Sequence, residues 1–177
     1  QEEIKPRATV LDETGQFPWD TVHLFAKNDM LNPLLPRKYG GVEVSTFMFC
    51  MIIEEIAKAC ASSALLLISQ AEGTLPIIYG GDEALKKKYL GRLTGDSQIL
   101  AALGTPEPTD HVKIFSHQIR AELQGGKYLI HGEKCLIKNG SIADFLVLYV
   151  NTDPSKPNHR MTALVVERGS PGLVYGR

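Results

Sequence analysis

The sequence has little of several features that mark specialised classes of protein. Its charges nearly cancel, with 19 Lys and Arg against 20 Asp and Glu, so it carries no electrostatic footprint for a nucleic-acid backbone or an anionic membrane. The GxGxxG and GxSxG motifs of dinucleotide-binding and hydrolase folds do not occur. Its apolar runs, such as residues 64–68, are far below the roughly 20 residues of a membrane-spanning helix. We therefore expect no nucleic-acid partner and no membrane span.

Cysteine is also scarce, and its spacing excludes the common metal motifs. Cys50, Cys60 and Cys135 form no CxxC pair and no ligand spacing with the five histidines, so we predict no metal site. The pattern places Cys50 and Cys60 on one helix, roughly 15 Å apart. A disulfide needs Cα atoms closer than about 7 Å. We therefore predict buried, reduced thiols, as in a cytosol or an organelle matrix.

The pattern of the chain changes near Gln98, from helical periodicity to alternation with glycine turns. Helices that precede strands, rather than alternating with them, predict an α+β fold and argue against parallel βαβ units. We divide the chain into an N-terminal α-helical domain, residues 1–98, and a β-domain, residues 99–177. The composition, 44% hydrophobic and 22% charged, is ordinary for globular proteins.

Capping residues and breakers set the expected helices. Pro18 suits the first turn of a helix that Pro33 and Pro36 would stop. Ser45 or Thr46 can cap a long helix that reaches about Gln70, whose apolar residues recur mostly at spacings of three, four and seven. The wholly apolar stretch at 64–68 indicates burial in a bundle or against another subunit. After the Gly80-Gly81 break, Asp82 can cap a further helix, on which Lys86, Lys87 and Lys88 form the solvated side.

Short apolar or alternating runs predict the strands. Gly125-Gly126 is a two-residue hairpin signal between two of them. The expected strands are 99–103, 117–124, 127–137, 145–150 and 161–166. The residues alone give no catalytic constellation: Glu54 and Glu55 point about 100° apart on a helix, and the histidines are dispersed.

Eight short motifs, in order and spacing, resemble the acyl-CoA dehydrogenase family over nearly the whole chain. Each is weak alone, but together they identify the chain as a member. They are FPW at 17–19, LPRKYGG at 35–41, IEEIA at 53–57, CAS at 60–62, YGGDEALKKKYL at 79–90, KYLIHGEK at 127–134, IKNG at 137–140 and AD at 143–144.

The resemblance implies a helical domain, a β-barrel-like middle domain and a C-terminal four-helix domain, the last of which we expect to be absent from these 177 residues. It also implies FAD as cofactor and an acyl-CoA as substrate, oxidised to the 2,3-enoyl-CoA. A glutamate would remove the α-proton, and the flavin would accept the β-hydride. Since the family's base lies in the absent domain, we predict no catalytic residue here and an inactive fragment.

The same resemblance supplies the cofactor-binding residues, by position in two flavin motifs. Ala102, Gly104 and Thr105 would face the flavin from the first, and Leu136, Ile137 and Lys138 from the second. Thr109 would replace the serine that precedes the aspartate, and is predicted to bind substrate. Both motifs depart from the family pattern: TPEPTD at 105–110 is shorter than TEPxAGSD, and Leu136 and Lys138 stand where an aromatic and a threonine are usual.

Those departures leave a second interpretation open, a degenerate, non-catalytic subunit that serves as a structural partner in a heteromer. An acyl-chain-binding helical module unrelated to redox chemistry would leave the β-domain motifs unexplained. For the dehydrogenase interpretation, the family implies an electron-transfer flavoprotein as acceptor and a homo- or hetero-tetramer. A bacterial cytoplasm, or alternatively a mitochondrial matrix, is the expected location.

Overall fold

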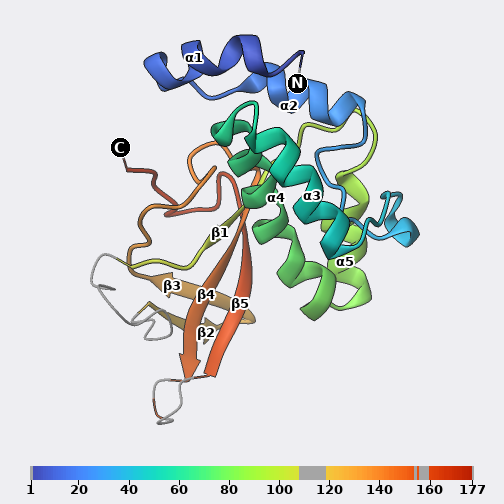
Figure 1. Ribbon diagram of the computed structural model, residues 1–177. Helices are drawn as coiled ribbons and strands as arrows, with labels where there is room; N and C mark the ends of the chain where they lie inside the picture. Colours follow the sequence, from blue (N-terminus) through green and yellow to red (C-terminus); the bar gives the residue numbers. More distant parts are fainter. Residues whose placement is uncertain (1, 108–118, 154, 156–159, 177) are drawn as a thin grey trace. The chain divides into compact units, whose positions relative to one another are not determined.

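The computed structural model describes residues 2–107, 119–153, 155 and 160–176, in two compact units. Residues 1–100 form a helical unit, and residues 101–177 form a unit built around one sheet (Figure 1). The predicted α+β class, with helices first and strands second, is confirmed. No strand occurs among the described residues before Ala101.

The helical unit contains five α-helices and two short 3-10 turns. They are α1 Lys5–Thr14, α2 Trp19–Lys27, α3 Thr46–Ala57, α4 Ala61–Gly80 and α5 Glu83–Tyr89, with 3-10 turns at Arg37–Tyr39 and Leu90–Arg92. Pro18 is the N-cap of α2 rather than its first residue. The helix ends well before Pro33 because the chain turns at Asp29, whose φ is +54°, a left-handed conformation that no regular helix continues.

The long helix predicted from Ser45 to Gln70 is two helices, so that prediction was wrong. Ser45 caps α3, accepting a hydrogen bond from the Met48 amide at 3.2 Å. The chain leaves the helical conformation at Cys60, with φ −160° and ψ 113°, before α4 begins. Neither glycine nor proline marks this break. Apolar periodicity ran across it because both helices are apolar.

The break also corrects the prediction for the cysteines. Cys50 lies on α3 and is exposed, whereas Cys60 is buried at the start of α4. The expectation that all the thiols are buried therefore fails at Cys50, and Cys135 is only partly buried. All three cysteines are free of disulfides.

Helices α3 and α4 lie side by side (Figure 1) but differ sharply in burial. Half of α4 is buried, including Leu66, Leu67 and Gln70, as the apolar stretch at 64–68 predicted, although Leu65 is 44% exposed. By length and composition α4 could also cross a membrane, but buried core helices of soluble proteins pass the same test, and 56% of its most apolar window is buried. By contrast, no residue of α3 is buried, and Phe47 is 73% exposed.

Glycine and an acidic cap define α5 as the sequence predicted. Helix α4 ends at Gly80, and Asp82 Oδ1 accepts a hydrogen bond from the Leu85 amide at 2.7 Å. Lys87 and Lys88 are exposed in the last turn of α5, where cations complement the helix dipole.

Among the residues described in the second unit, five strands form one mixed sheet. They are β1 Ala101–Gly104, β2 Arg120–Gln124, β3 Lys127–His131, β4 Phe145–Asp153 and β5 Arg160–Glu167. Strand β4 is central, parallel to β1 and antiparallel to β5, and the long β4–β5 pair is plain in Figure 1. Strand β2 meets β4 through the pair Arg120 and Asn151.

The predicted hairpin at Gly125-Gly126 is confirmed. Gln124 pairs with Lys127 across it, and both glycines have positive φ, 57° and 78°, as a type I′ turn requires. Strand β3 is shorter than predicted, since it ends at His131 and Gly132 follows with φ +139°. A side chain at Gly132 would come within 2.6 Å of Ile119. The close approach leaves no room for a side chain at this position.

Candidate functional site

The two segments predicted to face a flavin lie together in the β unit. Ala102 and Gly104 belong to β1, and Thr105 follows it directly. Leu136, Ile137 and Lys138 lie in the loop after β3. Thr109 lies outside the described residues.

Two hydrogen bonds join these segments. The Cys135 amide donates to the Pro106 carbonyl at 3.0 Å, and Lys134 Nζ donates to the Thr105 carbonyl at 3.0 Å. The segments are 29 residues apart at the second bond. The sheet therefore brings together two pieces of chain that the sequence could relate only through family motifs.

Gly104 and Ala102 lie in the core of the β unit. A Cβ atom on Gly104 would come within 2.4 Å of Leu148 Cδ2 and 3.1 Å of Ile137 Cδ1. Ala102 is 0% exposed and packs in the hydrophobic cluster with Leu148. Ala102 and Gly104 are thus both buried, and Ala102 presents no surface to a ligand.

Leu136, unlike Ala102 and Gly104, lies on the surface. It is 88% exposed, and its φ of +50° is left-handed. A bulky apolar side chain rarely adopts this conformation, and such backbone outliers cluster at functional sites. Lys138, two residues further on, is exposed as well.

The chemistry of the exposed residues in these segments is compatible with the predicted flavin contacts, which stay predictions. Leu136 offers an exposed apolar side chain, Lys138 an exposed cation and Thr105 a partly buried hydroxyl-bearing residue. They do not enclose a ligand. Two hollows among the described residues, of about 20 and 10 Å³, lie in the helical unit around Leu31 and Asn32, away from these segments. The candidate site is an open surface.

Sequence reasoning missed the charged pair beneath this surface. Lys134 Nζ lies 2.9 Å from Glu107 Oε1, and their side chains are only 4% and 3% exposed. Glu107 Oε1 also accepts a hydrogen bond from the Ile119 amide at 3.2 Å. Both residues belong to motifs that were used to recognise the family resemblance, Glu107 to TPEPTD at 105–110 and Lys134 to KYLIHGEK at 127–134. The available signal was that each is an ionisable residue beside a flavin motif.

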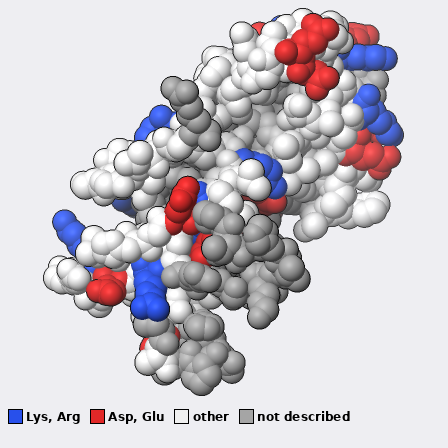
Figure 2. Space-filling model, turned by 90° about the vertical axis from the view of Figure 1, so that its left-hand side faces the viewer, with Lys and Arg blue, Asp and Glu red and all other residues white. Residues whose placement is uncertain are grey.

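The remaining electrostatics are those of an ordinary surface. Figure 2 shows Lys and Arg interspersed with Asp and Glu over the described part of the face that it draws. A hydrogen bond from Lys38 lowers the pKa of Glu83 and, with the Coulombic attraction, raises the pKa of Lys38. Hydrogen bonds to Glu55 and Glu54 raise the pKa of Lys58. The described residues contain no group of three or more His, Cys, Asp or Glu able to hold a metal.

Comparison with known proteins decides the family. The profile of the acyl-CoA dehydrogenase N-terminal domain matches residues 1–96. The chain belongs to the acyl-CoA dehydrogenase family. Its solved neighbours include butyryl-CoA dehydrogenase from Megasphaera elsdenii, with 30% identity and a TM-score of 0.89 over 99% of this chain and 47% of that one.

Two curated members of the acyl-CoA dehydrogenase family are much more similar in sequence. Both are named cyclohex-1-ene-1-carbonyl-CoA dehydrogenase. The one from Geobacter metallireducens is 51% identical over 99% of this chain, and the one from Syntrophus aciditrophicus is 47% identical over 98%. The chain spans 46% and 42% of their lengths, so it covers about half of each relative.

Proposed function

We propose that the whole protein is an FAD-dependent dehydrogenase that acts on a cyclic acyl-CoA thioester of the cyclohex-1-ene-1-carbonyl type. The observation that carries the substrate class is the 51% identity, over nearly the whole chain, to a dehydrogenase named for that compound. The geometry that supports the cofactor is the pair of segments joined by the bonds from Cys135 to Pro106 and from Lys134 to Thr105, next to which Leu136 and Lys138 are exposed.

Each segment would contribute differently to holding the flavin. The Thr105 hydroxyl and nearby backbone groups would supply hydrogen bonds, while Leu136 would cover part of the ring system. Lys138 would place a cation near the flavin, which favours a reduced, anionic ring. When bound, the flavin supplies a hydride acceptor for chemistry that no side chain performs.

The proposed substrate changes the positions that lose hydrogen. In a cyclohex-1-ene-1-carbonyl group the α-carbon is part of a ring double bond and carries no hydrogen. The acidic hydrogen is on the ring CH2 beside the far end of that double bond, because loss of that proton spreads the negative charge onto the thioester oxygen. A hydride from the CH2 on the other side of the α-carbon completes the oxidation. The product is a cyclohexadiene-carbonyl-CoA, rather than the 2,3-enoyl thioester of an acyclic substrate.

We also propose the electron acceptor, the assembly and the location of the whole protein, on the basis of its family. The base that accepts the proton would lie beyond residue 177, so the 177-residue chain alone is expected to turn over no acyl-CoA. Electron-transfer flavoprotein is the proposed acceptor, and a tetramer the proposed assembly, in a bacterial cytoplasm. A degenerate structural subunit is not favoured, since the most similar relatives given above are named as dehydrogenases.

The test is turnover by the purified whole protein with an artificial electron acceptor. Cyclohex-1-ene-1-carbonyl-CoA, cyclohexanecarbonyl-CoA and butyryl-CoA are compared at equal concentration, together with the visible spectrum of the bound cofactor. We expect a flavin spectrum and the highest kcat/KM for the cyclohexene thioester. Preference for butyryl-CoA would refute the substrate class, and the absence of flavin would refute the proposal as a whole.

A further inference from the structure

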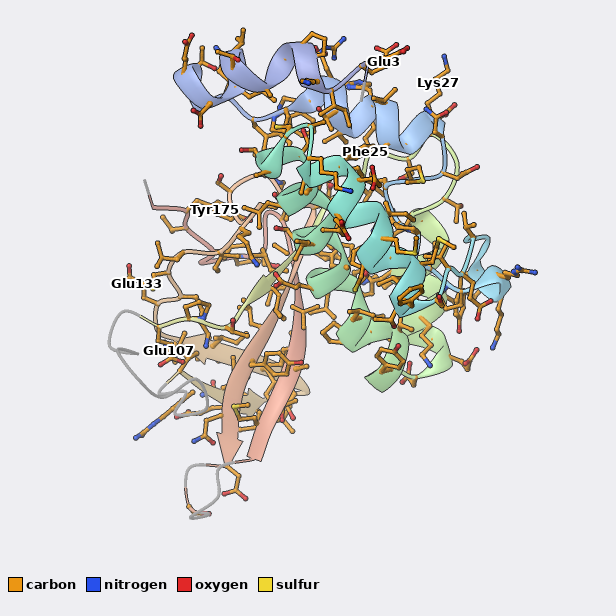
Figure 3. All side chains as sticks on the ribbon, in the orientation of Figure 1. Glu3, Phe25, Lys27, Glu107, Glu133 and Tyr175 are labelled. Carbon is orange, nitrogen blue, oxygen red and sulfur yellow. The ribbon has the colours of Figure 1, made fainter. Side chains whose placement is uncertain are left out.

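The buried pair of Lys134 and Glu107 joins three stretches of the β unit. Lys134 Nζ contacts Glu107 Oε1 at 2.9 Å and the Thr105 carbonyl at 3.0 Å. The same Glu107 oxygen accepts a hydrogen bond from the Ile119 amide at 3.2 Å. The end of β1, the residue before β2 and the loop after β3 therefore meet at one ion pair. Figure 3 labels Glu107 and Glu133, the chain neighbour of Lys134, at this end of the unit.

Stability alone is a poor reason for such a pair. Removing two charges from water costs several kcal/mol per ion, and well-packed apolar residues often do as well or better. The exposed pairs of Lys58 with Glu54 and Glu55 avoid that cost. A buried charge pair does, however, fix geometry, because its partners are satisfied in few arrangements.

The geometry that the pair fixes is that of the candidate flavin surface. Lys134 holds the carbonyl of Thr105, and the next residue, Cys135, donates its amide to Pro106. Leu136 follows immediately in its left-handed conformation. The positions of Thr105 and Leu136 relative to each other thus depend on contacts made at residues 134 and 135.

We propose that Lys134 and Glu107 are positioning residues that hold the Thr105 and Leu136 segments in register for the flavin, without touching it. This inference rests on the proposed flavin-dependent function. It predicts that flavin affinity follows the contact between Lys134 and the Thr105 carbonyl, rather than the stability of the unit.

The experiment compares Lys134→Met with the double variant Glu107→Gln/Lys134→Met in the whole protein. The single variant removes the ammonium that Glu107 contacts. The double variant also removes the buried negative charge, while the amide oxygen of the introduced glutamine can still accept from Ile119. Glu133→Gln is the matched control, since Glu133 is exposed. The measurements are the melting temperature, the hydrogen exchange of the Cys135 amide, and the Kd of FAD for the apoprotein from flavin fluorescence.

For Lys134→Met we expect a lower melting temperature, at least tenfold faster exchange at Cys135 and at least tenfold weaker FAD binding. The double variant should recover most of the melting temperature but keep the tenfold loss in affinity. Glu133→Gln should change the Kd less than twofold.

Recovery of FAD affinity together with the melting temperature in the double variant would overturn the inference, because the pair would then act through stability alone. Unchanged exchange at Cys135 in Lys134→Met would overturn it as well. If the unmodified protein binds no FAD while exchange at Cys135 still responds, the proposed function fails and the flavin role of the pair fails with it. Exchange and titration thus distinguish the two failures.

Discussion

Gln70 and Asn32 share a partly buried hydrogen bond of 2.9 Å, from Gln70 Nε2 to Asn32 Oδ1, although 38 residues separate them. Gln70 Nε2 also donates to the Ile99 carbonyl at 3.0 Å, and Asn32 Nδ2 donates to the Leu93 carbonyl at 3.0 Å. Helix α4 is thereby tied to the loop after α2 and to the two stretches that precede β1. These hydrogen bonds form a polar network within the helical unit that none of the sequence motifs predicted.

Replacement of this amide should destabilise the helical unit. Gln70→Leu keeps most of the volume but leaves partly buried acceptors on Asn32 and Ile99 without the Gln70 donor. We expect a loss of about 2–3 kcal/mol in the free energy of unfolding, measured by urea denaturation. Gln16→Leu makes the same change at an exposed position of the same unit and should cost less than about 0.5 kcal/mol. Equal effects of the two variants would contradict the role of the network.

Gly104→Ala should disturb the β unit through packing. The added methyl group would meet Leu148 at 2.4 Å and Ile137 at 3.1 Å, so β1 or its neighbours must shift, at a cost of about 1–3 kcal/mol. Gly176→Ala is the control, because its Cβ meets nothing within 4 Å and its φ is not positive. Thermal unfolding of both variants measures the difference. A Gly104→Ala protein as stable as the control would show that the close packing is not required.

The cap of α5 can be tested by a pair of substitutions. Asp82→Ala removes the acceptor for the Leu85 amide and should cost about 1 kcal/mol of stability. Asp82→Asn retains a side-chain oxygen and should restore most of that loss. Comparison of their urea midpoints measures the capping bond. If Asn rescues nothing, the negative charge near the helix dipole, rather than the hydrogen bond, carries the effect.

Leu136→Trp tests the flavin surface directly. Leu136 is already exposed in a left-handed turn, so a larger ring can be accommodated without displacing buried side chains. If it stacks on a flavin, it should contribute about 0.5–1.5 kcal/mol, roughly a two- to tenfold lower Kd for FAD. Leu123→Trp makes the same change on β2, where Leu123 is 64% exposed, and should leave the Kd unchanged. Equal Kd values for the two variants would argue against a flavin at Leu136.

Local chemistry explains which parts of the fold could be predicted from the sequence. The caps at Ser45 and Asp82 and the turn at Gly125-Gly126 depend on neighbouring residues, and all three were predicted. The break at Cys60 depends on packing that separates the buried α4 from the exposed α3. Since it has no local signature, the sequence pattern ran through it.

The candidate site likewise has a part that the sequence predicted and a part that it did not. Family motifs identified the stretches around Thr105 and Leu136, and the predicted flavin contacts there stay predictions. The ion pair of Lys134 with Glu107 could not be found from spacing, because its members are 27 residues apart along the chain. The two side chains meet because the loop after β3 reaches the residues that follow β1 in the folded sheet.

The parallel pairing of β1 with β4 also has a consequence during synthesis on the ribosome. Ala101 pairs with Phe145, 44 residues later in the chain. At about 5–20 residues per second, β1 leaves the ribosome roughly 2–9 seconds before the strand that it pairs with. During that interval its backbone amides and carbonyls lack their β4 partners. Slow translation between residues 105 and 144 should therefore lengthen the time in which this short strand is open to pairing with another nascent chain.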